Sequence, residues 1–237
     1  MSAPPLRGPA LFSQQWRDLT FMHWSIDPDL VAPLLPRGTV PDVLDGKTYV
    51  GLVPFHMRHA GLGSRFATPW LGDFPETNVR LYSVDGEGRH GVVFLSLESA
   101  RLLTTMAARW GYGIPYVWSK MRIGRRGTRL RYISKRRWPQ RGLWNSVTVE
   151  VGPKLPVDEQ PELMVFLTAR WGLHSTLAGR TIWTPNWHQR WPLHTAELLR
   201  LDDQLTGAAG VRVAGPPDVP TLWSGGVHTY FGFPQLI

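Results

Sequence analysis

The chain has 237 residues, of which 12 are tryptophan and none is cysteine, and it carries a formal net charge of +8. The absence of cysteine excludes disulfides, thiolate nucleophiles and cysteine-bound metal or iron–sulfur centres. A hydrophobic content of 43% with 19% charged residues is typical of a globular protein and not of a disordered chain. We therefore expect one folded domain at residues 16–237, preceded by a flexible arm at residues 1–15.

Strands dominate the elements that the sequence predicts. Alternating β-branched and aromatic residues, bounded by Gly, Pro and Asp, predict strands at Trp16–Ile26, Lys47–His56, Asn78–Val84, Gly91–Glu98, Tyr116–Ile123, Thr128–Ser134 and Ser146–Val151. Capping residues and prolines predict helices at Asp29–Leu35, Ser99–Trp110 and Pro161–Trp171, while Leu193–Leu205 fits either type. Strands and helices do not alternate as they do in a parallel α/β protein.

The positive charge is concentrated between Lys120 and Arg141, where glycines at 124 and 127 predict a hairpin. A solvated basic face explains this segment better than a phosphate-binding ribbon, because the chain has no helix-turn-helix, zinc-finger or RNP-type motif. Binding of nucleic acid or of an anionic surface stays open as an alternative. No signal peptide or long apolar span is evident, so we expect a cytoplasmic protein without a membrane partner.

The segment from Phe74 to Val84 carries most of the chemical information. A period of two places Glu76, Asn78, Arg80 and Tyr82 on one face of the predicted strand. This polar face either meets solvent or lines an interior. In an interior, burial would raise the pKa of Glu76 beside a cationic anion-binding residue, which suits acid/base chemistry.

At this point the ordered motifs resemble a known family. They are WRDLTFMHWSI, LLPRGTVPDVLDGKTYVGLVPFHM, FPETNVRLYSV, GIPYVWSKM, FLTARWGLH, WHQRWPLHTAELL and TLWSGGVHTYFG, and they span about Trp16 to Gly232. Together they look like the YqjF-like family, which is related to acetoacetate decarboxylase. The resemblance implies an α+β, mainly antiparallel fold: a closed β-barrel with a few peripheral helices and an internal polar pocket.

The resemblance also implies where this chain departs from the decarboxylase. That enzyme uses a Schiff-base lysine next to a second lysine after a Pro, and Tyr116 and Val117 stand at the matching positions here. Lys120 lies four residues beyond Tyr116, about 13 Å along a strand. We therefore do not expect Schiff-base decarboxylation. The candidate catalytic residues are Glu76 as acid or base, Arg80 as an anion clamp and Tyr116 as a phenolic donor.

Other residues are candidates for binding a substrate. Trp183, Trp187 and Trp191 have an even spacing that could form an aromatic wall on an extended chain. The candidate substrate-binding residues are Asn78, Tyr82, Trp118, Lys120, Trp187, Trp191 and His194. The histidines show no ligand spacing, and no phosphate loop or dinucleotide motif is present, so we expect neither a metal nor a cofactor.

These observations favour a cofactor-independent enzyme that uses acid/base chemistry on a carbonyl- or carboxylate-bearing, possibly aromatic, small molecule. Its reaction would be of the lyase, dehydratase, cyclase or isomerase type. One alternative is a barrel that binds a small ligand without turnover, and another is a binder of nucleic acid or an anionic surface through residues 120–141. A homo-oligomer remains open, and the sequence names no substrate.

Overall fold

A computed structural model describes residues 3–6, 8–63, 66–67, 72–101, 113 and 115–237. Its strands are β1 (Phe12–Ile26), β2 (Thr39–Pro41), β3 (Thr48–Leu62), β4 (Phe66–Ala67), β5 (Phe74–Asp85), β6 (His90–Ser99), β7 (Tyr116–Arg126), β8 (Arg129–Trp138), β9 (Trp144–Lys154), β10 (Gly172–Leu177), β11 (Arg180–Trp187), β12 (Leu193–Asp203), β13 (Leu222–Phe231) and β14 (Gln235–Leu236). The described helices are α1 (Pro28–Val31), α3 (Glu162–Thr168) and α4 (Leu205–Ala208), with 3-10 turns at Ala32–Leu34 and Val157–Glu159.

The expected strands are present, and most are longer than predicted. β1 begins at Phe12, so the last residues of the expected N-terminal arm belong to the sheet. The ambiguous segment Leu193–Leu205 is mostly strand β12, whereas β10, β11, β13 and the short strands β2, β4 and β14 were not predicted. Most of the expected helix at Ser99–Trp110 lies outside the described residues.

All the strands belong to one 14-stranded sheet whose hydrogen-bonded order is cyclic. One ring runs through β6, β7, β8, β9, β12, β13, β1, β3 and β5, because β5 pairs again with β6. A second ring branches from it through β10 and β11, since β6 pairs with β10 and β11 pairs with β13. Among the pairings described, only β6–β7 and β6–β10 are parallel, so the fold is mainly antiparallel β with few helices.

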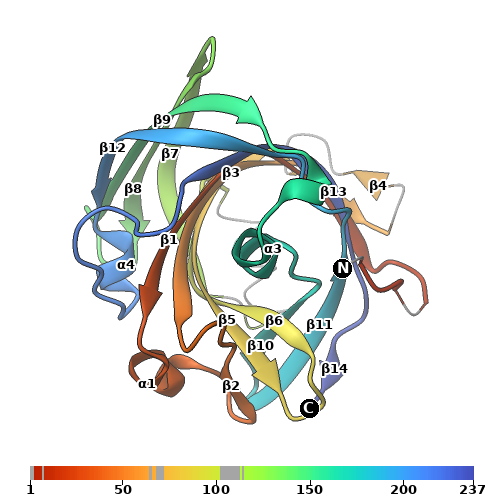
Figure 1. The fold of residues 1–237 in the computed structure, drawn as a ribbon. Coiled ribbons are helices and arrows are strands. Elements are labelled where there is room, and N and C mark those ends of the chain that lie inside the picture. The colour runs from red at the N-terminus through yellow and green to blue at the C-terminus, as the bar shows by residue number, and fades with distance from the viewer. Residues whose placement is uncertain (1–2, 7, 64–65, 68–71, 102–112, 114) are drawn as a thin grey trace.

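The two rings share β1, β3, β5, β6 and β13 and enclose different interiors (Figure 1). The interior beside β8 and β9 is apolar and contains Leu130, Tyr132 and Val147. The interior beside β10 and β11 contains α3, which Figure 1 shows inside the strands and not outside them. Each shared strand is thus covered on both faces, which explains why nearly every residue of β5 is buried.

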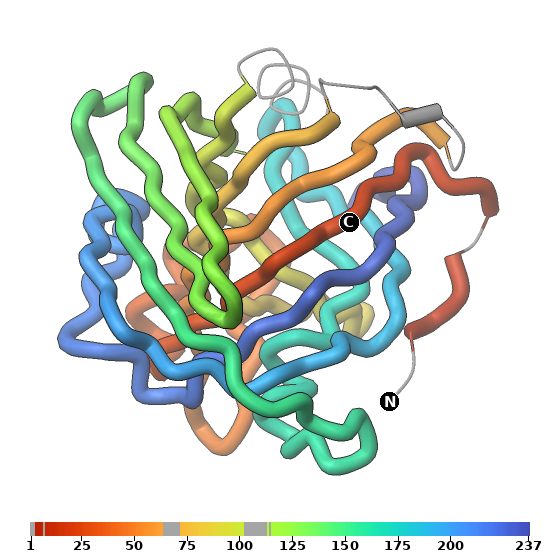
Figure 2. The backbone as a smooth tube through the Cα atoms, turned by 90° about the horizontal axis from the view of Figure 1, so that it is seen from above, coloured from red at the N-terminus to blue at the C-terminus, as the bar shows by residue number. Residues whose placement is uncertain are grey.

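Figure 2 shows the same arrangement from above, with strands β7, β8 and β9 at one side of the molecule and the N-terminus at the other. At the start of β1, the close approach of β13 requires a glycine. Gly226 has a φ of +117°, and a Cβ there would lie 1.8 Å from the carbonyl oxygen of Trp16.

Within the described residues, no helix has the length and apolar character needed to cross a membrane.

Candidate functional site

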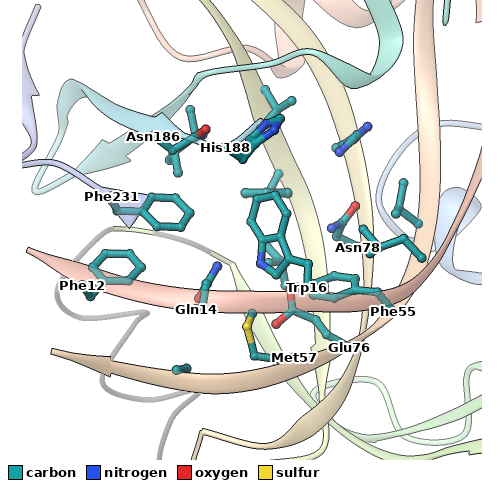
Figure 3. Close-up of a pocket in the computed structure, with 18 of the residues that line it drawn as sticks. Phe12, Gln14, Trp16, Phe55, Met57, Glu76, Asn78, Asn186, His188 and Phe231 are labelled. Carbon is teal, nitrogen blue, oxygen red and sulfur yellow. The ribbon is translucent and has the colours of Figure 1, made fainter. Parts of the chain in front are cut away.

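The interior that contains α3 holds a cavity of about 360 Å³ (Figure 3). Strands β1, β3, β5 and β6 supply most of its wall, and the segments after α3 and β11 complete it. Most lining residues are apolar. The polar ones are Gln14, Glu76, Asn78, Arg80, Tyr116, Thr168, Arg170, Asn186 and His188. This composition, an apolar cavity with a few convergent polar groups, is typical of a small-molecule site.

Strand β5 presents its polar face to the cavity. Phe74, Glu76, Asn78 and Arg80 all line it, as the period of two predicts for residues on one face of a strand. The intervening residues, such as Val79 and Leu81, pack into the other interior. The sequence left open whether this polar face meets solvent or lines an interior, and in the structure it lines an interior.

Glu76 and Tyr116 come together across two strands. Glu76 is 2% exposed, and its Oε2 accepts a 3.0 Å hydrogen bond from the Tyr116 hydroxyl. Burial raises the pKa of Glu76 to about 8, although the hydrogen bond from Tyr116 opposes the rise. Burial and the neighbouring Glu76 also raise the pKa of Tyr116 well above its usual value, so the phenol stays protonated. A carboxyl group that titrates near neutral pH can both give and take a proton.

Arg80 lies four residues farther along the same face and is 9% exposed. Its Nε donates to the Tyr82 hydroxyl at 3.1 Å, and its Nη2 donates to the Leu167 carbonyl at 2.9 Å. Gly51 on β3 leaves space for both His23 and Arg80, because a Cβ at that position would lie 3.0 Å from Nε2 of His23 and 3.3 Å from Cγ of Arg80. No ion pair joins Arg80 to Glu76 among the described residues. Glu76 and Arg80 therefore do not neutralise each other's charge by direct contact.

Arg170 also lines the cavity, but it has a carboxylate partner. Its Nη1 is bonded to Oδ2 of the buried Asp42, and the same oxygen is 2.7 Å from Nδ1 of His90. Burial lowers the pKa of Arg170, while Asp42 opposes this change. The pair thus places a neutralised cation at the end of α3.

An aromatic group forms another part of the wall. Trp16 and Trp191 stack with ring centroids 5.7 Å apart, and His188 lies 5.2 Å from the Trp191 ring. The two ring nitrogens of His188 face the Gln189 and Arg170 carbonyls at 2.8 and 3.0 Å, and burial lowers the pKa of this imidazole. Figure 3 shows Trp16, Phe55 and His188 around the cavity.

The structure thus brings Glu76, Asn78, Arg80, Tyr116 and Trp191 to one cavity. The other candidate residues lie outside its lining. Tyr82 is fully buried behind Arg80, and Lys120 is exposed. The guanidinium of Arg137 covers Trp118, 4.8 Å from the ring centroid. The ring centroid of Trp187 lies 6.0 Å from that of Tyr230, and the ring centroid of His194 lies 5.2 Å from that of Trp223. β11 ends at Trp187, so Trp191 is not on the same strand, and the even spacing of the tryptophans does not place all three on one face.

Several lining residues escaped the sequence reading. Arg170 and His188 lie in segments without regular periodicity, and only their position after α3 and β11 brings them to the cavity. Trp16 could have been noticed, because it begins the WRDLTFMHWSI motif. Among the described residues, no three His, Cys, Asp or Glu side chains are grouped to hold a metal ion.

The basic segment lies on the outside of β7 and β8. Lys120, Arg122, Arg131 and Lys135 are exposed. Arg136 is the exception, since it is 5% exposed and its Nε donates to both carboxylate oxygens of Glu98, at 3.1 and 3.2 Å. One arginine of this segment therefore belongs to an interior ion pair.

A family model, DUF2071, described as an uncharacterized conserved protein, matches residues 13–228. The uncharacterized protein YqjF of Bacillus subtilis (strain 168) is 26% identical over 212 residues, which cover 90% of this chain and 86% of YqjF. These findings confirm the family resemblance in the motifs.

Several solved enzyme structures share this fold. Acetoacetate decarboxylase from Legionella pneumophila matches with a TM-score of 0.69 at 13% identity, covering 100% of this chain and 92% of that one. The enduracididine biosynthesis enzyme MppR, complexed with pyruvate, matches with a TM-score of 0.66 at 14% identity over 98% and 91% of the two chains. An acetoacetate decarboxylase-like enzyme from Sphingomonas wittichii RW1 gives 0.65 at 12% identity over 98% and 94%. The chain belongs to the DUF2071 family and has an acetoacetate decarboxylase-like fold.

Proposed function

We propose that this protein is a cofactor-independent enzyme that transfers a proton at a carbon next to a carbonyl group, inside a closed β-barrel. The observation that carries the proposal is the buried Glu76 in the cavity, with its pKa raised to about 8 and its carboxylate bonded to Tyr116. A group whose pKa is near the working pH is well suited to general acid/base catalysis. Reactions of this type include enolisation, dehydration and cyclisation.

The roles of the residues follow from their contacts. Ionised Glu76 removes a proton from the carbon, and protonated Glu76 returns it at the same or another atom. The un-ionised Tyr116 phenol donates its one hydrogen bond to the Glu76 carboxylate in the free protein and, once Glu76 has taken the substrate proton, to the enolate oxygen. Asn78 lies between Glu76 and Arg80 on β5 and orients the substrate. This chemistry requires no lysine, and none is among the described residues that line the cavity.

The structural neighbours support an enzyme of this kind, because the fold also occurs in acetoacetate decarboxylase and in MppR, which has been solved with pyruvate. Acetoacetate, in the name of the first enzyme, and pyruvate, bound in the MppR structure, are both small oxo acids. For this chain the reacting group would be a ketone, and the chemistry would proceed through acid and base instead of a Schiff base. A barrel that binds such a ligand without turnover is the second candidate, which the absence of a Glu76–Arg80 ion pair disfavours.

The test is deuterium exchange in D₂O, followed by proton NMR, with pyruvate, levulinate and 3-benzoylpropionate as probes. We expect the wild-type protein to accelerate loss of the proton signal next to the ketone of at least one probe. Glu76→Gln should abolish the acceleration, and Glu159→Gln, a change at an exposed glutamate in a 3-10 turn, should not. Binding of a probe without exchange would favour the non-catalytic barrel, and equal exchange in Glu76→Gln would exclude the proposed role of this residue.

A further inference from the structure

Arg80 is a nearly buried cation that has only neutral partners. Its Nε and Nη2 donate to a phenol and to a backbone carbonyl, and Nη1 donates to no described residue. The other buried arginines of the described chain behave differently, because Arg170 is paired with Asp42 and Arg136 with Glu98. Arginine is almost never this buried without a counter-charge. An uncompensated guanidinium in a cavity wall favours a ligand that brings an anion.

This cation is well separated from the acid/base pair. Cα atoms four residues apart on a strand, such as those of Glu76 and Arg80, are about 13 Å apart. The Arg80 side chain does not fold back toward Glu76, because its Nε bonds to Tyr82, which is two residues farther along β5. Arg80 is also not among the groups that shift the pKa of Glu76. A ligand anion at Arg80 is therefore several bonds away from an atom that contacts Glu76.

The sheet register places an apolar opening on the other side of Glu76. On β3, Gly51 lies opposite Arg80, Phe55 opposite Glu76, and Met57 opposite Phe74. Leu62, at the end of β3, lines the cavity and is 71% exposed, so the cavity opens there.

Aromatic rings surround this opening. Phe12, which lies opposite Leu62 in the register, stacks on Phe231 with ring centroids 4.4 Å apart. Figure 3 shows both rings on the side of the cavity away from Asn78. The wall therefore changes from a cation at the inner end, through the acid/base pair, to apolar rings at the mouth.

From this order of groups we propose that the ligand is an elongated amphipathic oxo acid, with its carboxylate at Arg80, its ketone beside Glu76 and Tyr116, and an aryl or alkyl tail at the mouth. The position of the ketone rests on the proposed function, whereas the positions of the carboxylate and the tail do not. Three-carbon acids such as pyruvate are too short to contact Arg80 and Glu76 together. The preferred substrate thus differs in length from the ligand of the MppR structure.

The test is a homologous series in which a phenyl ketone is joined to a carboxylate by spacers of increasing length. Benzoylformate, 3-benzoylpropionate, 4-benzoylbutyrate and 5-benzoylvalerate form this series, and calorimetry measures the affinity of each. We expect one of the longer members to bind roughly 10- to 100-fold more tightly than benzoylformate. Its carboxylate can reach Arg80 and form a charge-assisted hydrogen bond there, whereas the carboxylate of benzoylformate cannot. The methyl ester of the best member should lose this gain, a comparison that needs no variant.

Protein variants locate the effect. Arg80→Met should bring all members of the series to similar affinity, and Arg80→Lys should restore part of the dependence on length. Arg131→Met, at an exposed arginine on the outside of β8, is the matched control and should change nothing. Leu62→Asp at the mouth should weaken the phenyl compounds more than the corresponding methyl ketone levulinate.

The outcomes separate this proposal from the proposed function. Binding that depends on spacer length, without any deuterium exchange, would overturn the proposed enzymatic function and leave the ligand assignment intact. Exchange with affinities that do not depend on spacer length, or an equal loss for every member in Arg80→Met, would overturn the ligand assignment alone. Failure of every member to bind would also overturn it.

Discussion

The hydroxyl of Tyr116 on β7 donates a 3.0 Å hydrogen bond to Oε2 of Glu76 on β5, although the two residues are 40 positions apart. The parallel pairing of β7 with β6 makes this contact possible, because it places Tyr116 opposite Leu97, which in turn lies opposite Asn78. Tyr116 is the residue that the motif resemblance matches to a lysine of the decarboxylase, and here it donates a hydrogen bond to the carboxyl group of Glu76.

Replacement of Glu76 by Gln should change how stability depends on pH. The carboxyl pKa is 4.5 in an exposed setting and about 8 in the folded protein, so the unfolded chain loses the proton first as pH rises. Wild-type stability should therefore fall between pH 4.5 and about 8 and then level off, by roughly 4–5 kcal/mol in total from this group. Urea unfolding of both proteins across this range measures the difference. Parallel curves would contradict the raised pKa.

Replacement of Tyr116 by Phe should raise the pKa of Glu76 still further. The phenol donates to the carboxylate and so stabilises its ionised form, which opposes the effect of burial. Titration of carbon-13-labelled glutamate by NMR should show the midpoint moving above about 8. Tyr230→Phe, in the β11–β13 contact with Trp187, is the control. An unchanged or lowered midpoint would mean that the hydrogen bond does not act as described.

Removal of one partner of the Arg136–Glu98 pair should be strongly destabilising. Both side chains are buried, so Arg136→Met leaves a buried carboxylate without its counter-charge and, among the described residues, with only the Ser96 and Ser119 hydroxyls as donors, at a cost of about 3–5 kcal/mol. The double variant Arg136→Met/Glu98→Gln should be more stable than the single one. Denaturant unfolding of the variants, with Arg129→Met in an exposed pair for comparison, tests this. Equal stability of the single and double variants would show that the carboxylate is compensated by other groups.

Trp191 and Trp187 should differ in what they contribute to stability. Trp191 is 2% exposed and packs against Trp16 and Phe21, so truncation to Ala should cost about 3–5 kcal/mol. Trp187 is half-buried at the end of β11, and its truncation should cost clearly less. Thermal and urea unfolding of the two variants provide the comparison. A larger loss at Trp187 would contradict the packing seen here.

The polar face of β5 could be predicted because strand alternation is a local property. The period of two alone groups Glu76, Asn78 and Arg80, and the resemblance to a barrel family favours an interior for them. Local rules also predicted seven of the 14 described strands. They could not predict that both faces of β5 are buried, because this depends on the second ring through β10 and β11.

The rest of the cavity depends on long-range packing. Arg170 reaches it only because α3 lies inside the sheet, and its ion pair with Asp42 joins positions 128 residues apart. The tryptophan spacing was misleading for the opposite reason. It is even through Trp183 and Trp187, but the chain leaves the strand before Trp191, and the regular spacing no longer determines which side chains share a face.

The position of α3 affects how this binding site could change during evolution. In most barrels, side chains of the strands set the interior volume, so a new ligand requires changes on hydrogen-bonded strands. Here a seven-residue helix occupies the interior, and its fully buried Leu167 contacts the same core as Tyr82. Substitution on that helix can enlarge or narrow the chamber while every strand pairing stays in place. A change at Thr168, the described α3 residue that lines the cavity, can therefore alter the cavity while the sheet stays constant.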